Sequence, residues 1–159
     1  QGLNNKDCVV REPDTVIFVF GEIDARCHII LQIEKGRDEE EIIATLVRNY
    51  LSTICLNIKQ FQKVHAAVFA IVPPTNQAEN PEFPIRGSLQ ERCRITKKIN
   101  QRLHEEAKKL GIGVIDVYDD YATCEGSLNP ALSDGLVHIH PNHTQAVERK
   151  LLQFLIHHS

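Results

Sequence analysis

The chain has 159 residues, of which 42% are hydrophobic and 25% are charged, and this composition suits one globular domain with a buried core. Its 18 basic and 21 acidic residues give a formal net charge of −3, which excludes a general electrostatic attraction to nucleic acid or to an anionic membrane. No apolar run reaches the roughly 18 residues that a membrane-spanning helix needs. We therefore expect neither a nucleic-acid partner nor a membrane partner.

Three apolar runs rich in β-branched and aromatic residues predict strands that are buried on both faces. They lie at residues 15–20, 66–72 and 113–117. The second run is stopped by Pro73 and Pro74, which cannot continue a central strand. Each run is followed by a polar segment, so the strands predict a sheet with loops at its carboxyl edge.

Helical patterns alternate with these strands. Apolar residues at helical spacing predict helices over 38–61, 88–111 and 144–158. The first helix starts with acidic residues, as a helix N-terminus prefers, and Ser88 with Glu91 predicts a capping box for the second. Strands that alternate with helices predict an α/β domain with a parallel sheet and right-handed crossovers.

The five cysteines are an odd number, are widely separated and form no Cys-x-x-Cys pair. This pattern favours reduced thiols over a disulfide framework and predicts a cytoplasmic location. Three strands make a thin sheet, and we expect an upstream strand–helix unit or a partner chain, such as a second copy in a homo-oligomer, to complete it.

Polar side chains gather where the predicted strands end, which is the edge at which parallel α/β sheets bind ligands. After the first strand the candidates for substrate binding are Asp24, Arg26 and His28, and after the second they include Asn76. The same residues also suit plainer roles. Asp24 and Arg26 are equally compatible with a local ion pair, and His28 with a structural histidine. The acidic residues after the third strand suit a loop cap and a solvated turn: Asp116, Asp119 and Asp120.

The segment "DGLVHIHPNH", residues 134–143, carries the strongest chemical signal. Asp134 stands four residues before His138 and six before His140. A carboxylate close before a histidine can accept its Nδ1–H, which fixes the tautomer and stabilises the imidazolium that forms when the other nitrogen takes a proton. The pattern predicts a general base at this edge. A zinc site built from His138, His140 and His143 is the metal-dependent alternative, although no cysteine or Glu-x-x-His pair completes a recognisable ligand set.

Two segments together resemble conserved blocks of SGNH/GDSL-type hydrolases. Residues 133–155, "SDGLVHIHPNHTQAVERKLLQFL", are similar to the block in which the Asp and His of a catalytic triad precede the C-terminal helix. Residues 16–24, "VIFVFGEID", are similar to the block in which a buried strand ends in a Gly-x-Asn-Asp turn, and "VPPTN" at 72–76 also fits. The likeness extends over about residues 14–155.

The resemblance implies a flavodoxin-like, three-layer α/β/α fold over residues 1–159. It also implies hydrolysis of an acyl ester of a small molecule or carbohydrate, without a cofactor or a metal. His138 would be the general base, Asp134 would orient it, and Gly21 would serve the oxyanion. His140 is the alternative base, because "HIHP" favours His138 and "HPN" favours His140.

The chain departs from the family pattern at the nucleophile and at the oxyanion site. It contains no Gly-Asp-Ser, and Ile23 stands at the usual asparagine position, where Arg26 is the candidate replacement donor. The Asp–His spacing is one residue longer than usual for His138. Because the chain begins with Gln1 and contains no methionine, we expect it to be the C-terminal part of a longer chain that carries the first strand and its serine. A non-catalytic ligand-binding or assembly domain of the same fold is the alternative.

Overall fold

The computed structural model describes residues 10, 13–61, 63–77 and 81–158. Its strands are parallel and lie in chain order in one sheet: β1 (Thr15–Val19), β2 (His65–Phe69) and β3 (Gly113–Ile115). Ala66 is opposite Val16 of β1, and Val68 is opposite Val114 of β3. The predicted parallel sheet is therefore confirmed.

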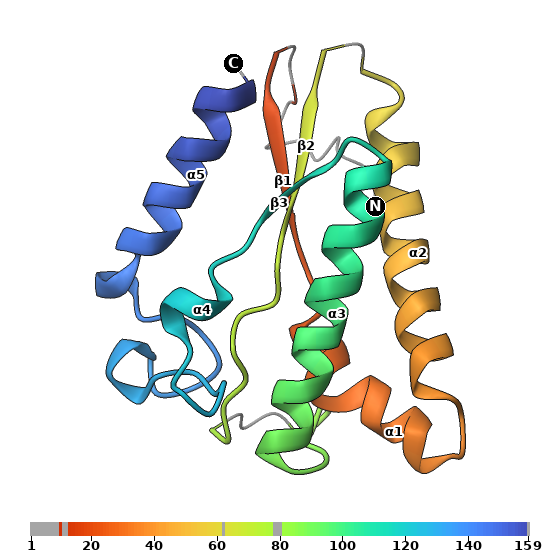
Figure 1. Ribbon diagram of the computed structural model, residues 1–159, viewed down its shortest axis with the longest axis vertical. Coiled ribbons are helices and arrows are strands. Elements are labelled where there is room, and N and C mark those ends of the chain that lie inside the picture. The colour runs from red at the N-terminus through yellow and green to blue at the C-terminus, as the bar shows by residue number, and fades with distance from the viewer. Residues whose placement is uncertain (1–9, 11–12, 62, 78–80, 159) are drawn as a thin grey trace.

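Helices cover both faces of the sheet. The long helices α2 (Glu39–Ile58) and α3 (Leu89–Lys109) pack side by side on one face, and α5 (Gln145–His158) lies on the other (Figure 1). On the α5 side, Phe154 packs against Ala67 and Ile115 of the sheet. The predicted three-layer α/β/α arrangement is confirmed.

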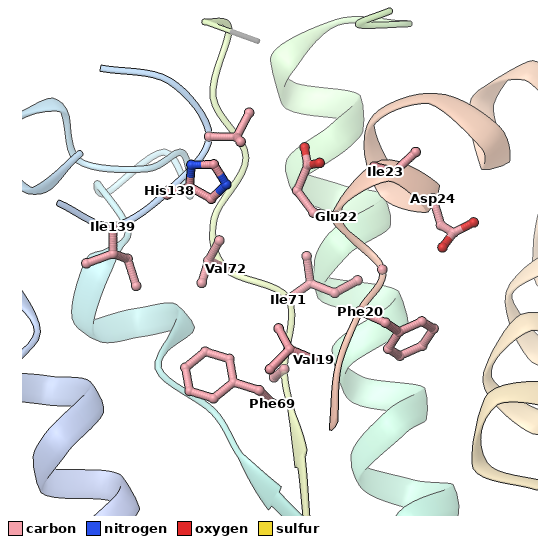
Figure 2. A pocket seen from close by; sticks show the side chains of 13 residues that line it. Val19, Phe20, Glu22, Ile23, Asp24, Phe69, Ile71, Val72, His138 and Ile139 are labelled. Atoms are coloured by element: carbon pink, nitrogen blue, oxygen red, sulfur yellow. The ribbon is translucent and has the colours of Figure 1, made fainter. Parts of the chain in front are cut away.

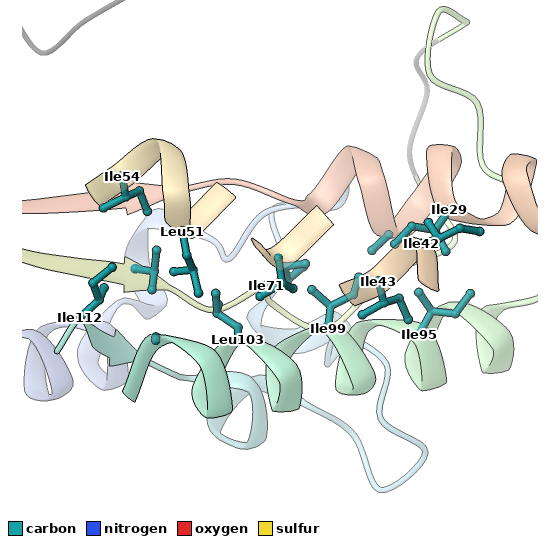
Figure 3. Packing of buried hydrophobic residues seen from close by; sticks show 14 of the residues in the cluster. Ile29, Ile42, Ile43, Leu51, Ile54, Ile71, Ile95, Ile99, Leu103 and Ile112 are labelled. Carbon is teal, nitrogen blue, oxygen red and sulfur yellow. The ribbon is translucent and has the colours of Figure 1, made fainter. Parts of the chain in front are cut away.

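The main core lies between the sheet and the helices α2 and α3 (Figure 3). It is built largely from isoleucine and leucine, with the apolar side chains of α2 and α3 facing Val68 of β2. The most deeply buried of these side chains are Val47, Leu51 and Ile54 of α2 and Ile95, Ile99 and Leu103 of α3. Full burial of each such side chain stabilises the fold by about 1.5–3 kcal/mol, before conformational entropy is counted.

The ends of the long helices follow the sequence signals. The Ser88 hydroxyl accepts a hydrogen bond from the backbone N–H of Glu91 at 3.1 Å, as a cap does. Asp38 does the same for α2 by accepting from the N–H of Glu41 at 2.8 Å. Gly111 follows α3 with a φ of 68°, a left-handed conformation that favours glycine.

One helical segment is not predicted by the sequence patterns. Residues Asp24–His28 form a π-helical turn that continues into α1 (Ile29–Glu34), where a polar loop and an apolar stretch are expected. The segment is too short for periodicity to reveal it. Its order comes from burial, because Ala25, Ile29 and Ile30 enter the main core.

The second strand is shorter than predicted, because its end is held by a side chain. β2 ends at Phe69, and the chain then runs on without a strand partner for Ile71. Asn100 of α3 accepts from the Ile71 N–H at 3.0 Å and donates to the Ile71 carbonyl at 2.8 Å. This buried amide satisfies the backbone groups that a neighbouring strand would otherwise bond.

Short turns connect β3 to α5. They are α4 (Tyr118–Tyr121), η2 (Pro130–Leu132) and η3 (Pro141–His143). The cysteines that the structure describes, Cys27, Cys55, Cys93 and Cys124, are free thiols, and Cys8 lies outside the described residues. None of the helices within the described ranges combines the length and the apolar character needed to cross a membrane.

Candidate active site

The loop after η2 brings Asp134 and His138 into direct contact. The Asp134 Oδ2 lies 2.9 Å from the His138 Nδ1. Its Oδ1 accepts from the backbone N–H of Leu136 at 2.7 Å and from that of His138 at 3.2 Å. The loop is closed by a bond from the Asp134 N–H to the His138 carbonyl at 3.0 Å. One carboxylate therefore fixes both the backbone turn and the imidazole.

These bonds affect the pKa of Asp134 and the orientation of the His138 ring. Hydrogen bonds from the Leu136 N–H, and from the ring and N–H of His138, lower the pKa of Asp134 from its usual value. A carboxylate beside Nδ1 places the ring proton on Nδ1, which leaves Nε2 with a lone pair. Because 72% of the His138 side chain is exposed, Nε2 can reach a substrate or a nucleophile.

His138 lines a pocket at the carboxyl edge of the sheet (Figure 2). The cavity has a volume of about 540 Å³, within the range of small-molecule sites. Its lining comes from three places: the end of β1 and the turn after it, the end of β2, and the loop that carries His138. These residues are Val19, Phe20, Gly21, Glu22, Ile23, Asp24, Phe69, Ala70, Ile71, Val72, Val137, His138 and Ile139. The walls are largely apolar, with polar groups at few points.

Gly21 lets the chain turn sharply between β1 and the helical segment. Its φ is 100°, a left-handed conformation that side chains rarely adopt. A Cβ on Gly21 would lie 2.7 Å from the Ile71 Cδ1, so a larger residue would clash with the pocket floor. The predicted oxyanion role of Gly21 stays a prediction, but its position on the pocket wall is suited to it.

The polar residues after Gly21 do not form the Asp24–Arg26 ion pair that was one of the two interpretations of the sequence. Arg26 binds Glu22 instead, with its Nε 2.6 Å from Oε1 and its Nη2 3.0 Å from Oε2. Asp24 pairs with His28, at 3.0 Å between Oδ1 and Nδ1. The physical reason is the unpredicted helical turn, because residues four apart in a helix face each other, whereas residues two apart do not.

Arg26 is buried and already engaged. Its Nη1 donates to the Phe83 carbonyl, and its other nitrogens bind Glu22. An oxyanion role for Arg26 would require these bonds to be exchanged. Glu22, not Arg26, is among the residues that line the pocket. The sequence signal for the Glu22–Arg26 ion pair is the i, i+4 spacing of the two residues. That spacing predicts a contact only where the segment is assumed to be helical.

Other candidates lie outside the pocket lining. His28 is half-exposed and sits edge-on to the Phe83 ring. The Asn76 carbonyl oxygen accepts from Arg92, a buried arginine that also binds backbone carbonyls of the loops around it. Asp116 bonds the Tyr118 N–H and the His104 ring, both at 2.8 Å, so the loop-cap interpretation of Asp116 fits. None of these side chains lines the pocket.

The histidines after His138 have separate roles. The His140 Nδ1 accepts from the Asn142 N–H at 3.1 Å and caps a short helical turn. The His140 and His143 rings are 5.5 Å apart, and His138 is bound to Asp134. Within residues 10, 13–61, 63–77 and 81–158, no three His, Cys, Asp or Glu side chains converge in a metal-binding group. Of the two candidate bases, His138 lines the pocket and His140 does not.

None of the serines in the described part of the chain lines the pocket. Ser88 caps α3, and the Ser127 hydroxyl lies 2.9 Å from that of Thr123. Ser133 accepts a hydrogen bond from the Gly135 N–H at 3.0 Å. The described residues thus place the candidate base His138 and its partner Asp134 at the pocket, but no serine beside them.

Solved structures share this architecture. A provisionally assigned platelet activating factor from Streptococcus pneumoniae superposes with a TM-score of 0.64 at 15% identity, over 89% of this chain and 59% of that one. A provisionally assigned acylhydrolase from Bacteroides fragilis superposes with a TM-score of 0.59 at 15% identity, over 92% of this chain and 88% of that one. A GDSL-like lipase from Bacteroides thetaiotaomicron superposes with a TM-score of 0.51 at 20% identity, over 67% of this chain and 49% of that one.

The chain therefore shares the fold of these solved structures, one of which is a GDSL-like lipase. It spans 59% and 49% of the length of two of these proteins and 88% of the third. No protein-family model matches the sequence, and no curated protein is significantly similar to it. The similarity to these proteins is therefore found in the fold, whereas in the sequence the resemblance is limited to short motifs.

Proposed function

We propose that this protein is an acyl-ester hydrolase of the SGNH type in which His138 is the general base. Asp134 holds the imidazole in the tautomer that leaves Nε2 open, so Nε2 takes a proton from the attacking hydroxyl and returns it to the leaving alcohol. Gly21 lies at the oxyanion position that the fold resemblance implies. The substrate is an acyl ester, with a carbohydrate as one candidate alcohol.

The single observation that carries this proposal is the Asp134–His138 pair at the mouth of an apolar pocket. The two side chains are 2.9 Å apart, and His138 lines a cavity of about 540 Å³ at the carboxyl edge of a parallel sheet. Ligands of such sheets bind at this edge. The largely apolar walls support binding of an acyl chain through burial of its methylene groups.

The proposal takes the serine nucleophile from sequence N-terminal to Gln1. Support comes from the open side of the pocket at the end of β1, where Val19 is 74% exposed at the edge of the sheet. A strand added parallel to β1 would end beside this pocket, and a residue just after that end would face His138.

The decisive experiment is hydrolysis of p-nitrophenyl acetate by the encoded protein that includes the sequence before Gln1. His138→Ala should lower kcat by about 10²–10⁴-fold, which is the usual contribution of general acid–base catalysis. His140→Ala and His143→Ala should retain kcat close to that of the wild type, because neither ring lines the pocket. Loss of activity on His140→Ala with survival on His138→Ala would contradict the assignment.

A non-catalytic binding domain of the same fold is the second candidate. It is favoured by Ile23, which stands at the usual asparagine position and cannot donate a hydrogen bond to an oxyanion. If the wild-type protein with its upstream sequence hydrolyses p-nitrophenyl acetate no faster than free imidazole does, this second candidate replaces the first.

A further inference from the structure

We propose that Glu22 is the specificity-determining residue for the alcohol part of the substrate, and that it accepts a hydrogen bond from a hydroxyl group there. This inference rests on the ester hydrolase function proposed above and goes beyond it, because it names which alcohols the site prefers. The preferred ester joins an apolar acyl chain to a hydroxyl-bearing alcohol.

Glu22 is held rigidly on the pocket wall. It follows Gly21 directly, lines the pocket, and has a side chain that is 34% exposed. The buried Arg26 donates two hydrogen bonds to the Glu22 carboxylate, at 2.6 Å and 3.0 Å, and Arg26 also donates to the Phe83 carbonyl. Such a bidentate interaction fixes the plane of a carboxylate as well as its position. Glu22 therefore lines the pocket with a side chain that is already ordered before a ligand binds.

The carboxylate of Glu22 retains capacity to accept further hydrogen bonds. Its two oxygens can accept about four hydrogen bonds in total, and Arg26 supplies two. Among the described residues that line the pocket none is a lysine or an arginine, so Arg26 is the cation that shares the Glu22 oxygens with a ligand donor. A hydroxyl group, which can donate a hydrogen bond, suits this acceptor.

Glu22 and His138 lie on opposite sides of the pocket in Figure 2, with Ile71 and Val72 on the floor. An ester placed beside His138 therefore meets two kinds of surface. The apolar side chains suit an acyl chain, and Glu22 suits a hydrogen-bond donor. Asp24, the other acidic residue of the lining, is already paired with His28. This division assigns the hydroxyl-bearing part of the substrate to the Glu22 side.

The test compares two ethers that cannot be hydrolysed, 1-O-octylglycerol and octyl methyl ether, in calorimetric binding to the full-length protein. The glycerol ether carries hydroxyl groups and the methyl ether carries none. A hydrogen bond to a charged group corresponds to roughly 10- to 100-fold in affinity. We expect the wild-type protein to prefer 1-O-octylglycerol by about this factor, and Glu22→Gln to lose most of the preference.

Glu34→Gln is the matched control. Glu34 is also paired with an arginine, Arg86 at 2.9 Å, but does not line the pocket, so this variant should keep the wild-type preference. Thermal unfolding checks that Glu22→Gln is folded. If it is not, Glu22→Asp takes its place, since retracting the carboxylate by one methylene should also reduce the preference.

An equal affinity of the wild-type protein for both ethers would overturn the role of Glu22, and so would a preference that persists in the folded Glu22 variant. Binding needs neither a nucleophile nor a base, so these results do not depend on catalysis. A normal binding preference without any ester hydrolysis would refute the proposed function and leave the role of Glu22 standing.

Discussion

Asp134 has two structural roles: it stabilises the backbone of its loop, and it orients the His138 ring. Its Oδ1 binds two backbone N–H groups of the loop, while its Oδ2 binds the His138 ring. An asparagine at this position can still accept bonds through its carbonyl oxygen, but its amide group cannot accept the Nδ1–H of the imidazole. The backbone role and the ring-orienting role are therefore separable by substitution.

Asp134→Asn should lower kcat for p-nitrophenyl acetate by a factor of about 10² or more in the complete protein, because the ring loses the partner that fixes its tautomer. Circular dichroism should show the fold unchanged. Asp119→Asn is a suitable control, since Asp119 is exposed and does not line the pocket. If Asp134→Asn retains full kcat, His138 does not depend on this carboxylate.

At the residue scale, the sequence predicts contacts that are local and misses those that need tertiary structure. The contact between Asp134 and His138 was predicted from residues four apart in one loop. The pairing of Arg26 with Glu22 was not predicted, because it depends on a helical turn that follows from burial of neighbouring residues. Glu22 follows the first predicted strand, but its place in the pocket lining is known only from the cavity itself.

At the level of elements, α3 supports the pocket through Asn100. This buried amide binds both the N–H and the carbonyl of Ile71, at 3.0 Å and 2.8 Å, where β2 has no further strand partner. Ile71 lies on the pocket floor. A helix side chain thus fixes the stretch of backbone that joins the sheet to the site.

Asn100→Ala should lower the free energy of unfolding by about 2–4 kcal/mol, because it leaves two buried backbone groups unsatisfied and removes packing volume. Urea denaturation of the variant and the wild type measures this difference. Asn49→Ala in α2 is the control: Asn49 is exposed, and its substitution should change stability by less than about 0.5 kcal/mol. Equal stabilities for Asn100→Ala and wild type would show that the Ile71 backbone finds other partners.

The order of the elements was predictable because each long helix and each buried strand has its own periodic signal. Ile95, Ile99 and Leu103 of α3 repeat at helical spacing, and all three are buried. The segment from Asp24 to Glu34 was not recognised as helical, because it is short and its first turn is π-helical. Long elements reveal themselves by period, whereas short ones are decided by what they pack against.

At the scale of the whole molecule, the edge of the described sheet and the pocket lie next to each other, at the end of β1. β1 is an edge strand of the described sheet, and Val19 at its end is 74% exposed while also lining the pocket. The candidate base His138 and the apolar wall of the pocket both lie in this chain. Under the proposed function, the serine nucleophile belongs to a further strand that pairs with this edge.

The most direct test of the account is mass-spectrometric mapping of a fluorophosphonate label on the encoded protein with its upstream sequence. If the proposed hydrolase function is right, we expect one labelled serine N-terminal to Gln1. Labelling should be slower by about 10²-fold or more in His138→Ala, because the base activates the nucleophile. Labelling at Ser88 or Ser127, or labelling at the same rate in the wild type and in His138→Ala, would contradict it.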